Sequence, residues 1–164
     1  MTTTTADIKT SYPLPSYQYQ VIFSDGNGNV QTISFASVTG LSVVYDTTTY
    51  LQSSSTSGNG SPQLLMMPGL PNRSNPINFT RGIINDGNIA YLYDWISSIQ
   101  GNIIDKRDIT VYLCDDQANP IVTWKIGNAF PIRLDAPSFI ASSNDAAIEC
   151  LQLLADTITM STAS

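Results

Sequence analysis

Alternating apolar and polar positions predict short β-strands along most of the chain. Residues 17–23 place tyrosine, valine and phenylalanine at every second position, and residues 108–114 repeat this with isoleucine, valine and leucine. Turn-forming residues at 24–29 and 115–120 end two of these strands. Further strands are predicted at 30–35, 41–51, 76–84, 121–126 and 146–160, the last with a kink near Asp156. Pro131 indicates a bend or a sheet edge.

One helix is predicted at about residues 88–100. Its apolar positions follow the helical period and form a single stripe, made of Ile89, Leu92, Tyr93, Ile96 and Ile99. The predicted caps are Asp86 or Asn88 at the start and Gly101 at the end. Asp94 lies on the polar side of the stripe and Trp95 beside it. Six to eight strands and one helix indicate a barrel or sandwich with the helix on one side or end.

An abrupt change of polarity occurs in the middle of the chain. Residues 52–63 are rich in serine and glycine, which predicts a flexible loop, and the apolar run 64–67 follows directly. Such a run after a polar loop predicts that the loop lands on the chain's own core or on a neighbouring chain. Residues 1–16 are rich in threonine and proline and are predicted to form an extended arm.

The low content of charged residues favours an assembled protein. Hydrophobic residues make up 42% of the chain and charged residues only 12%, about half the usual share. The surface must therefore be covered by uncharged polar side chains, which lose little when they are buried against other copies. A secreted polar β-domain is the alternative interpretation of the same composition.

The net charge of −6 argues against nucleic acid and anionic membranes as partners. Lys106 and Arg107 form the only adjacent basic pair, and Asp105 and Asp108 flank it. The N-terminal residues carry neither a basic region nor an apolar core, so no secretory signal is predicted. No apolar run approaches the ~20 residues of a membrane-spanning helix. The product is expected to stay in the cytoplasm unless lysis or a dedicated machine releases it.

Residues that carry catalysis or bind metals are scarce. The chain has no histidine, which excludes histidine-dependent nucleophiles and histidine-containing zinc sites. Residues 25–29 resemble the start of an EF-hand loop, but Val30 and Ala36 stand where that loop needs glycine and glutamate. Cys114 and Cys150 are predicted to be small buried residues without a disulfide. We expect no metal, no cofactor and no enzymatic activity.

Glu149 is the only glutamate of the chain. A carboxylate within an apolar strand can act as an acid or a base when burial raises its pKa. No catalytic partner for it is evident, and an ion pair with Arg81 or Lys125 is the preferred interpretation.

Several short strings, taken in order, resemble one known family. They are residues 67–71, 77–82, 92–96, 106–111, 122–126, 128–131 and 147–149. Their order and spacing are similar to those of the tail tube proteins of contractile phages. The resemblance is strongest to the inner tube subunits of extracellular contractile injection systems, such as antifeeding-prophage-like particles, and it covers about residues 12–160.

The resemblance implies a mainly β fold with two antiparallel sheets, forming a small barrel or sandwich, and one flanking helix. It implies a single tail-tube domain over residues 1–164, with an N-terminal arm at 1–16 and an assembly loop at 46–67. Six copies would form a ring whose strands line a central channel, and rings would stack inside a contractile sheath. The implied partners are further copies, the sheath protein, baseplate and tube-initiator proteins, and a cargo effector in the channel.

The resemblance also suggests roles for particular residues. The predicted contacts between subunits or rings come from Asp46, Tyr50, Leu51, Leu64, Leu65, Met66, Met67, Arg81, Lys106 and Arg107. An ion pair within the chain is an equal alternative for Arg81. Asp94 and Trp95 are predicted to face the sheath.

Two other functions fit parts of the sequence. The chain could form the tube-initiator ring near the baseplate of the same particle. A monomeric β-sandwich that binds carbohydrate is the alternative from another class, because Trp95, Trp124 and eight tyrosines could supply an aromatic platform. Most of these aromatic residues, however, fall on alternating positions typical of a core.

Overall fold

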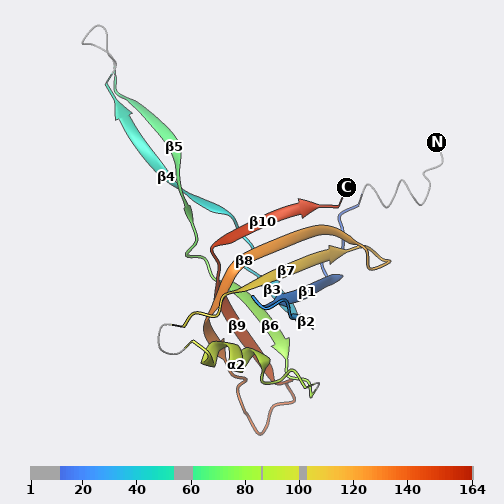
Figure 1. Cartoon of the computed structure of the whole chain (residues 1–164). Coiled ribbons are helices and arrows are strands. Elements are labelled where there is room, and N and C mark those ends of the chain that lie inside the picture. Colours follow the sequence, from blue (N-terminus) through green and yellow to red (C-terminus); the bar gives the residue numbers. More distant parts are fainter. Residues whose placement is uncertain (1–11, 54–60, 86, 100–102, 164) are drawn as a thin grey trace, which may run out of the picture.

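The computed structural model describes residues 12–53, 61–85, 87–99 and 103–163. Two antiparallel layers of strands form the body, and a long two-stranded hairpin projects from it (Figure 1). The predicted fold class is confirmed: the chain is mainly β, with two antiparallel sheets and one helix. The described strands do not close into a barrel, since each layer ends at strands that lack a partner on their outer side.

The first layer contains strands from the beginning, the middle and the end of the sequence. It consists of β1 (Tyr19–Ser24), β2 (Val30–Ile33), β7 (Arg107–Cys114), β10 (Thr157–Thr162) and the first part of β8 (Pro120–Asp135). Their order is β2-β1-β7-β8-β10. Val21 lies opposite Val111, and Phe23 lies opposite Ile109. These four side chains are buried, so this face of the layer carries the core.

The second layer packs against the apolar face of the first. It consists of β3 (Ser37–Thr39), β6 (Ile77–Gly82), β9 (Ile148–Leu154) and the end of β8. Ile77 lies opposite Leu153, and Phe79 lies opposite Leu151. All four side chains are buried in the cluster that also holds the inward residues of the first layer.

Strand β8 is shared by the two layers and bends between them. Its first part pairs with β7 and β10, and the part from Phe130 onward pairs with β9. The register shifts between Pro131 and Arg133, where proline cannot donate a ladder hydrogen bond. The bend predicted at Pro131 is therefore confirmed. Gly127 permits the close approach of the C-terminal strand, because a Cβ there would lie 2.4 Å from the Thr157 hydroxyl oxygen.

The helix is shorter than predicted, and its buried side differs from the predicted stripe. Helix α2 spans Tyr91–Ser97 and buries Leu92 and Trp95, while Tyr93 is exposed. The indole of Trp95 fills the core and Phe23 meets it edge-on, so this large ring sets the inward face of the helix. No side chain caps the start of the helix. The predicted caps Asp86 and Gly101 lie outside the described residues.

Two further differences concern strands. The predicted strand at 146–160 is divided into β9 and β10, because the backbone N–H of Asp156 donates to the carbonyl of Gly127 and interrupts the ladder at the predicted kink. Strand β3 was not predicted, since its three residues are too few to show a period.

Two turns of the first layer use the same construction. The Asp25 carboxylate accepts hydrogen bonds from the backbone N–H groups of Asn27 and Asn29, at 3.1 and 2.8 Å. Asp115 accepts in the same way from Gln117 and Asn119, both at 2.8 Å. In both turns an aspartate and an asparagine four residues later close the loop. The aspartates of these turns are thus structural.

The fourth residue of each turn has a left-handed backbone, and it differs between the two. Gly28 has φ 85°, and Ala118 has φ 63°. A Cβ makes this conformation unfavourable by about 1 kcal/mol or more, whereas glycine adopts it freely. We expect Ala118→Gly to raise the free energy of unfolding by about 0.5–1 kcal/mol and Gly28→Ala to lower it by a similar amount, both measured by urea denaturation. Equal stability of Ala118→Gly and the parent would contradict this account of the turn.

Hydrogen bonds in the first of these turns lower the pKa of Asp25. The main donor is the side-chain amide of Asn29, whose Nδ2 lies 2.8 Å from Asp25 Oδ2. A carboxylate with a lowered folded-state pKa stabilises the fold above its unfolded pKa, and this stabilisation is lost as the pH falls through the folded pKa. We expect Asn29→Ala to move the pKa of Asp25 up toward its ordinary value in an NMR titration. An unchanged pKa would show that the backbone N–H groups alone set it.

Candidate assembly surfaces

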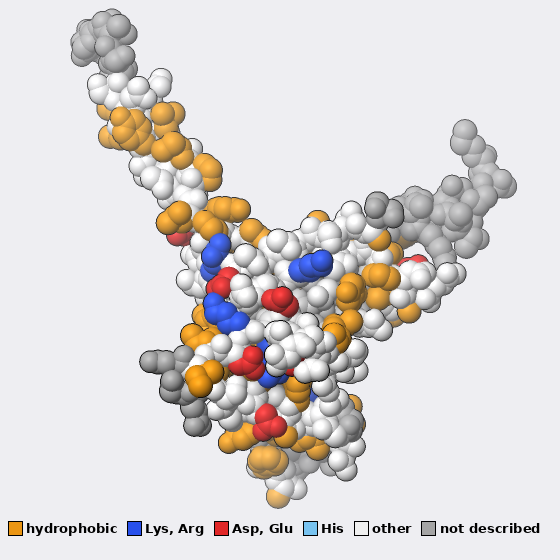
Figure 2. Space-filling model, viewed as in Figure 1, with side chains coloured by type: hydrophobic (Ala, Val, Ile, Leu, Met, Phe, Trp, Pro, Cys, Tyr) orange, Lys and Arg blue, Asp and Glu red, His pale blue; other side chains and the backbone are white. Residues whose placement is uncertain are grey.

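The hairpin formed by β4 (Val44–Gln52) and β5 (Gln63–Asn72) is a separate two-stranded sheet outside the core. Its strands pair only with each other among the described elements (Figure 1). Apolar side chains run along the arm in the space-filling view (Figure 2). Part of the predicted loop at 52–63 is thus strand, while residues 54–60 lie outside the described residues.

Six of the exposed apolar side chains lie in the outer part of the arm, and we call them the hairpin cluster. Its members are Tyr50, Leu51, Leu64, Leu65, Met66 and Met67. Their exposed fractions range from 44% to 69%, and none belongs to the buried core. The alternative in which the apolar run lands on the chain's own core is therefore wrong.

Asp46 shapes the base of the hairpin. The register shifts between Tyr45 and Thr47, so that Asp46 stands opposite Gly69 and Leu70 in a bulge of β5. Its Oδ1 accepts a hydrogen bond of 3.0 Å from Asn72 Nδ2. Gly69 lies against the same point, because a Cβ there would be 2.9 Å from the Asp46 carbonyl oxygen. Asp46 thus joins the two strands at the base of the hairpin, and its predicted role between subunits remains a prediction.

Open strand edges are the second surface suited to association. Strands β2 and β10 bound the first layer, and β3 bounds the second, with no strand on their outer sides in the described part of the chain. The end of β8 pairs only with β9 within the same described ranges. Unpaired edges offer backbone donors and acceptors to another chain.

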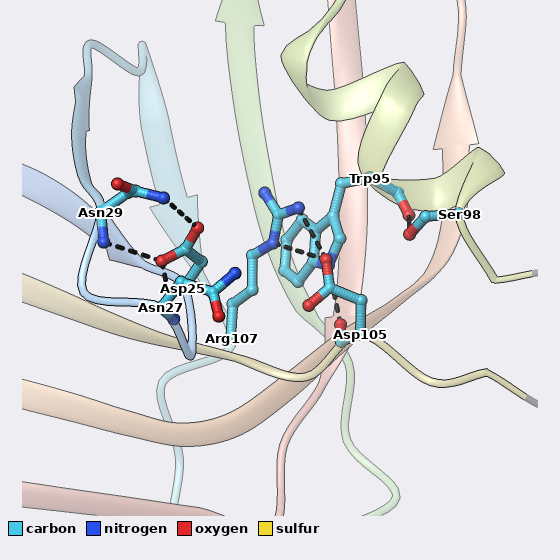
Figure 3. A network of polar contacts seen from close by, with 7 residues as sticks. All are labelled: Asp25, Asn27, Asn29, Trp95, Ser98, Asp105 and Arg107. Carbon is cyan, nitrogen blue, oxygen red and sulfur yellow. Dashed lines mark hydrogen bonds and ion pairs between the residues drawn. The ribbon is translucent and has the colours of Figure 1, made fainter.

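Arg107, at the start of β7, contacts aromatic side chains of the helix (Figure 3). Its Nε and Nη2 donate to Asp105 Oδ2, at 3.0 and 2.7 Å. Its guanidinium carbon lies 4.9 Å from the Trp95 ring centre and 5.0 Å from that of Tyr91. The Trp95 indole N–H in turn donates to the Asp105 carbonyl at 2.8 Å. These contacts within the chain engage Arg107, so its predicted contact at the ring edge gains no support from the structure.

The prediction that Trp95 faces the sheath is wrong. Its side chain is 0% exposed, because the ring closes the core beneath the helix. The neighbouring Asp94 is exposed, and its contact with a sheath remains a prediction.

Arg81 and Glu149 form a buried ion pair between facing positions of β6 and β9. Arg81 Nη2 also donates to the carbonyls of Asn88 and Ile89, at 3.1 and 3.2 Å. The ion pair expected for Glu149 is confirmed, with Arg81 as the partner. A contact from Arg81 to a neighbouring subunit is wrong for this conformation, because the side chain is only 7% exposed and its Nε and Nη2 groups donate within the chain. The pair ties the segment before α2 to the second layer.

Lys106 remains at the surface. Its Nζ lies 2.8 Å from Asp156 Oδ2, and this bond lowers the pKa of the Asp156 carboxyl. Both side chains are more than a third exposed, so the pair contributes little to stability. The predicted role of Lys106 between subunits stays open to test.

Sequence reasoning missed two exposed apolar sites. Phe139 and Ile140 lie in the segment between β8 and β9, with exposed fractions of 87% and 61%. At the base of the hairpin Val43, Tyr45 and Leu70 are also exposed. The signal for the first site was an apolar pair within a run of serine, alanine and proline, which resembles an ordinary loop.

The described residues contain no group of three or more cysteine, aspartate or glutamate side chains that could hold a metal ion. Cys114 and Cys150 are free thiols on different strands. Among the same residues, no helix is long and apolar enough to cross a bilayer.

Comparisons with known proteins give matches over most of the chain. The family model for the T4-like virus tail tube protein gp19 matches residues 15–159. A chain from the cryo-EM structure of an extracellular contractile injection system, the PVC sheath–tube complex in the extended state, is 37% identical. That match covers 99% of this chain and 100% of the other, with a TM-score of 0.80.

Two further solved structures give similar values. A chain from the PVC sheath/tube terminator in the extended state is 36% identical, covering 93% of this chain and 99% of its own, with a TM-score of 0.79. A chain from the tube-terminating cap of the anti-feeding prophage is 32% identical over 93% of both chains, with a TM-score of 0.77. A comparison with curated protein sequences found no significant match.

Proposed function

The chain belongs to the T4-like virus tail tube protein family, and from this membership we propose that it is the inner-tube subunit of a contractile injection particle. Six copies form a ring, and rings stack into a tube with a central channel inside a sheath. On contraction the tube is driven into a target cell and delivers cargo.

The family and the similar solved structures consist of structural tube proteins, and the chain is not an enzyme. The resemblance read from the sequence is thereby confirmed. The alternative of a monomeric carbohydrate-binding module fails, because the family is structural and Trp95 is buried where it cannot form a binding platform.

The hairpin cluster is the observation that carries the proposal. A two-stranded hairpin alone is at best marginally stable in water. Here it extends from the body with its leucine, methionine and tyrosine side chains exposed. Burying each such side chain contributes about 1.5–3 kcal/mol, so the arm gains most of its stability from contacts with other copies.

The open edges of the first layer support ring formation. Pairing of β10 in one copy with β2 in the next continues the sheet around a ring and removes both edges. The apolar face is already covered by the second layer, so only the opposite face is free to line a channel. Register places Thr110, Thr123 and Thr159 on that face beside Lys125, together with the less polar Ile22 and Tyr112. A lining in which polar side chains predominate limits apolar adhesion of a cargo protein that passes through the channel.

The proposed partners follow from this assembly. They are further copies of the chain, a sheath protein around the tube, baseplate and tube-initiator proteins at one end, and a cargo effector in the channel. Assembly takes place in the cytoplasm, and lysis releases the particle to the outside.

The position along the tube can be tested directly. The similar structures include a tube complex, a tube terminator and a tube-terminating cap, so both a main-tube and an end position fit the relatives. We expect gold-labelled antibodies against this chain to decorate the whole exposed tube of contracted particles. Label confined to one end would assign the chain to an initiator or terminator ring. Absence of label from tubes that a sheath antibody detects in the same particles would contradict the proposal.

A further inference from the structure

The strands of the first layer carry very few of the chain's charges. Strands β1, β2 and β10 contain no charged residue. Strand β7 contains Arg107 and Asp108, and the first part of β8, which pairs with β7 and β10, contains Lys125. The Arg107 guanidinium lies over the rings of Tyr91 and Trp95 at the helix. Only Asp108 and Lys125 are therefore left for the face that the proposed tube turns toward its channel.

The alternation along the strands places both charges on that face. Asp108 and Lys125 are exposed, whereas Ile109 and Ile126, which follow them, are buried in the core. Lys125 lies opposite Thr110, two residues along β7 from Asp108, so the two charged positions are about 7 Å apart along the strand direction. Both border one open hollow of this face, whose other polar side chains are serine and threonine.

The charge of Lys125 has no use within the fold. Its amine forms no ion pair with another described residue. Asp108 accepts one hydrogen bond at Oδ1, from the backbone N–H of Asn128 at 2.9 Å. Ion pairs engage four other basic side chains of the described chain, namely Arg81, Lys106, Arg107 and Arg133. The positive charge at position 125 thus contributes to the face itself, where it offsets Asp108.

We infer that the channel wall of the proposed tube is electrically neutral and takes cargo proteins of either charge sign, with Lys125 as the residue that sets this property. The inference rests on the proposed function. In a ring of six, a circle of lysines lies beside a circle of aspartates, and the strands of the wall carry no net charge. The net charge of −6 in each chain then belongs to the rest of its surface.

The balance matters because a channel concentrates the effect of its wall charges. A cleft lined by one sign of charge raises the local concentration of oppositely charged molecules by about 10–1000-fold and repels those of like charge. With both signs on neighbouring circles, the two potentials cancel within roughly one screening length of the wall. Cargo is then admitted by its size and its polar surface, and the sign of its charge has little influence.

Uptake of matched peptides by purified tubes tests the inference. Three short unstructured peptides of glycine and serine carry a dye and either several glutamates, several lysines or no charge. Tubes are incubated with each peptide at low ionic strength, treated with a protease too large to enter the channel, and sedimented. The protected dye in the pellet measures uptake. We expect wild-type tubes to take up the three peptides to within about threefold of one another.

Lys125→Glu is expected to make the channel selective. The substitution lowers the wall charge by 2 in each copy and by 12 in a ring of six, so uptake of the acidic peptide should fall by ~10-fold or more relative to the basic one. High salt should restore equal uptake, since it screens the wall. Lys125→Gln changes the charge by 1 in each copy and gives a smaller shift in the same direction, which decides the matter if the glutamate circles prevent assembly.

Arg133→Glu is the matched control on the other layer. It changes the charge of the chain by the same amount, and the Arg133 side chain is 63% exposed at the end of β8. Its tubes are expected to take up the three peptides as the wild type does. Asp108→Asn tests the opposite sign, because the amide oxygen can still accept from Asn128 while the wall gains a positive charge. These tubes should favour the acidic peptide.

The outcomes separate the neutral channel from the tube itself. Equal uptake by the wild type, with opposite shifts in Lys125→Glu and Asp108→Asn, supports the inference. Wild-type tubes that prefer one charged peptide by tenfold or more overturn it and leave the tube intact. Equal effects of Lys125→Glu and Arg133→Glu, or loss of tubes in both Lys125 variants alone, place Lys125 outside the channel and also overturn it. A wild-type chain that forms no tubes overturns the proposed function, and the inference with it.

Discussion

Replacing all six side chains of the hairpin cluster by serine is expected to give a folded monomer that forms neither rings nor stacks. None of the six belongs to the buried core, so the free energy of unfolding of the body is expected to change by less than about 0.5 kcal/mol. Association loses the burial of six apolar side chains in each copy, which lowers the affinity by more than about a thousandfold. Sedimentation velocity and urea denaturation of the same samples measure the two effects.

A matched control keeps the apolar character of the arm. Exchange of Leu64 with Met66, as Leu64→Met and Met66→Leu, preserves the apolar area of one face and is expected to preserve assembly. Wild-type assembly of the six-serine variant would show that the hairpin is an ordinary surface arm. A six-serine variant with greatly reduced stability would show that the arm packs on its own body in solution.

Arg81→Ala is expected to destabilise the folded subunit by about 3–5 kcal/mol. The substitution leaves Glu149 as a buried carboxylate without its cation, and it frees the carbonyls of Asn88 and Ile89 from two hydrogen bonds. Because small domains are stable by only about 5–15 kcal/mol, such a loss consumes much of the total. Urea denaturation of the monomeric six-serine background measures it without interference from assembly.

Two companion variants identify the cause of that loss. Arg133→Ala removes an ion pair with Asp135 whose side chains are 63% and 45% exposed, so little change is expected there. The double variant Arg81→Met/Glu149→Met removes both buried charges and is expected to recover much of the stability. If Arg81→Ala prevents assembly but changes stability no more than Arg133→Ala does, then Arg81 acts between subunits and the buried pair has been misjudged.

The strands of the body could be predicted because each has one buried face. In β1 and β7 the inward residues Val21, Phe23, Ile109 and Val111 alternate with half-buried or exposed neighbours, which produces a period of two in the sequence. The ion pair of Glu149 could also be predicted, since a lone carboxylate in an apolar strand needs a cation nearby. Register then selects Arg81, which lies directly opposite it.

Most of β4 lies within the strand predicted at 41–51, but β5 and the pairing of the two strands were missed. Strand β5 begins with a continuous apolar run, and β4 is rich in threonine, so neither strand shows the alternation of a half-buried sheet. The physical reason is that neither face of the hairpin packs on the chain's own core, so burial within the chain imposes no period of two on its sequence.

The buried side of the helix was mispredicted because two interpretations fit the same residues. A stripe through Leu92, Tyr93 and Ile96 follows the helical period, and a shorter line through Leu92 and Trp95 does so as well. In a helix of seven residues the period is too short to decide between them. The helix turns Trp95 inward because the indole buries a large apolar area there and its N–H donates to the Asp105 carbonyl.

Negative-stain microscopy of the purified protein over a series of concentrations tests the central claim most directly. The account predicts ring-shaped particles of sixfold symmetry with a central channel, which stack into tubes as the concentration rises or when a baseplate is added. Sedimentation of the same samples should show a species of six times the 17.8 kDa chain mass. A protein that stays monomeric at every concentration, with a baseplate present, would contradict the account.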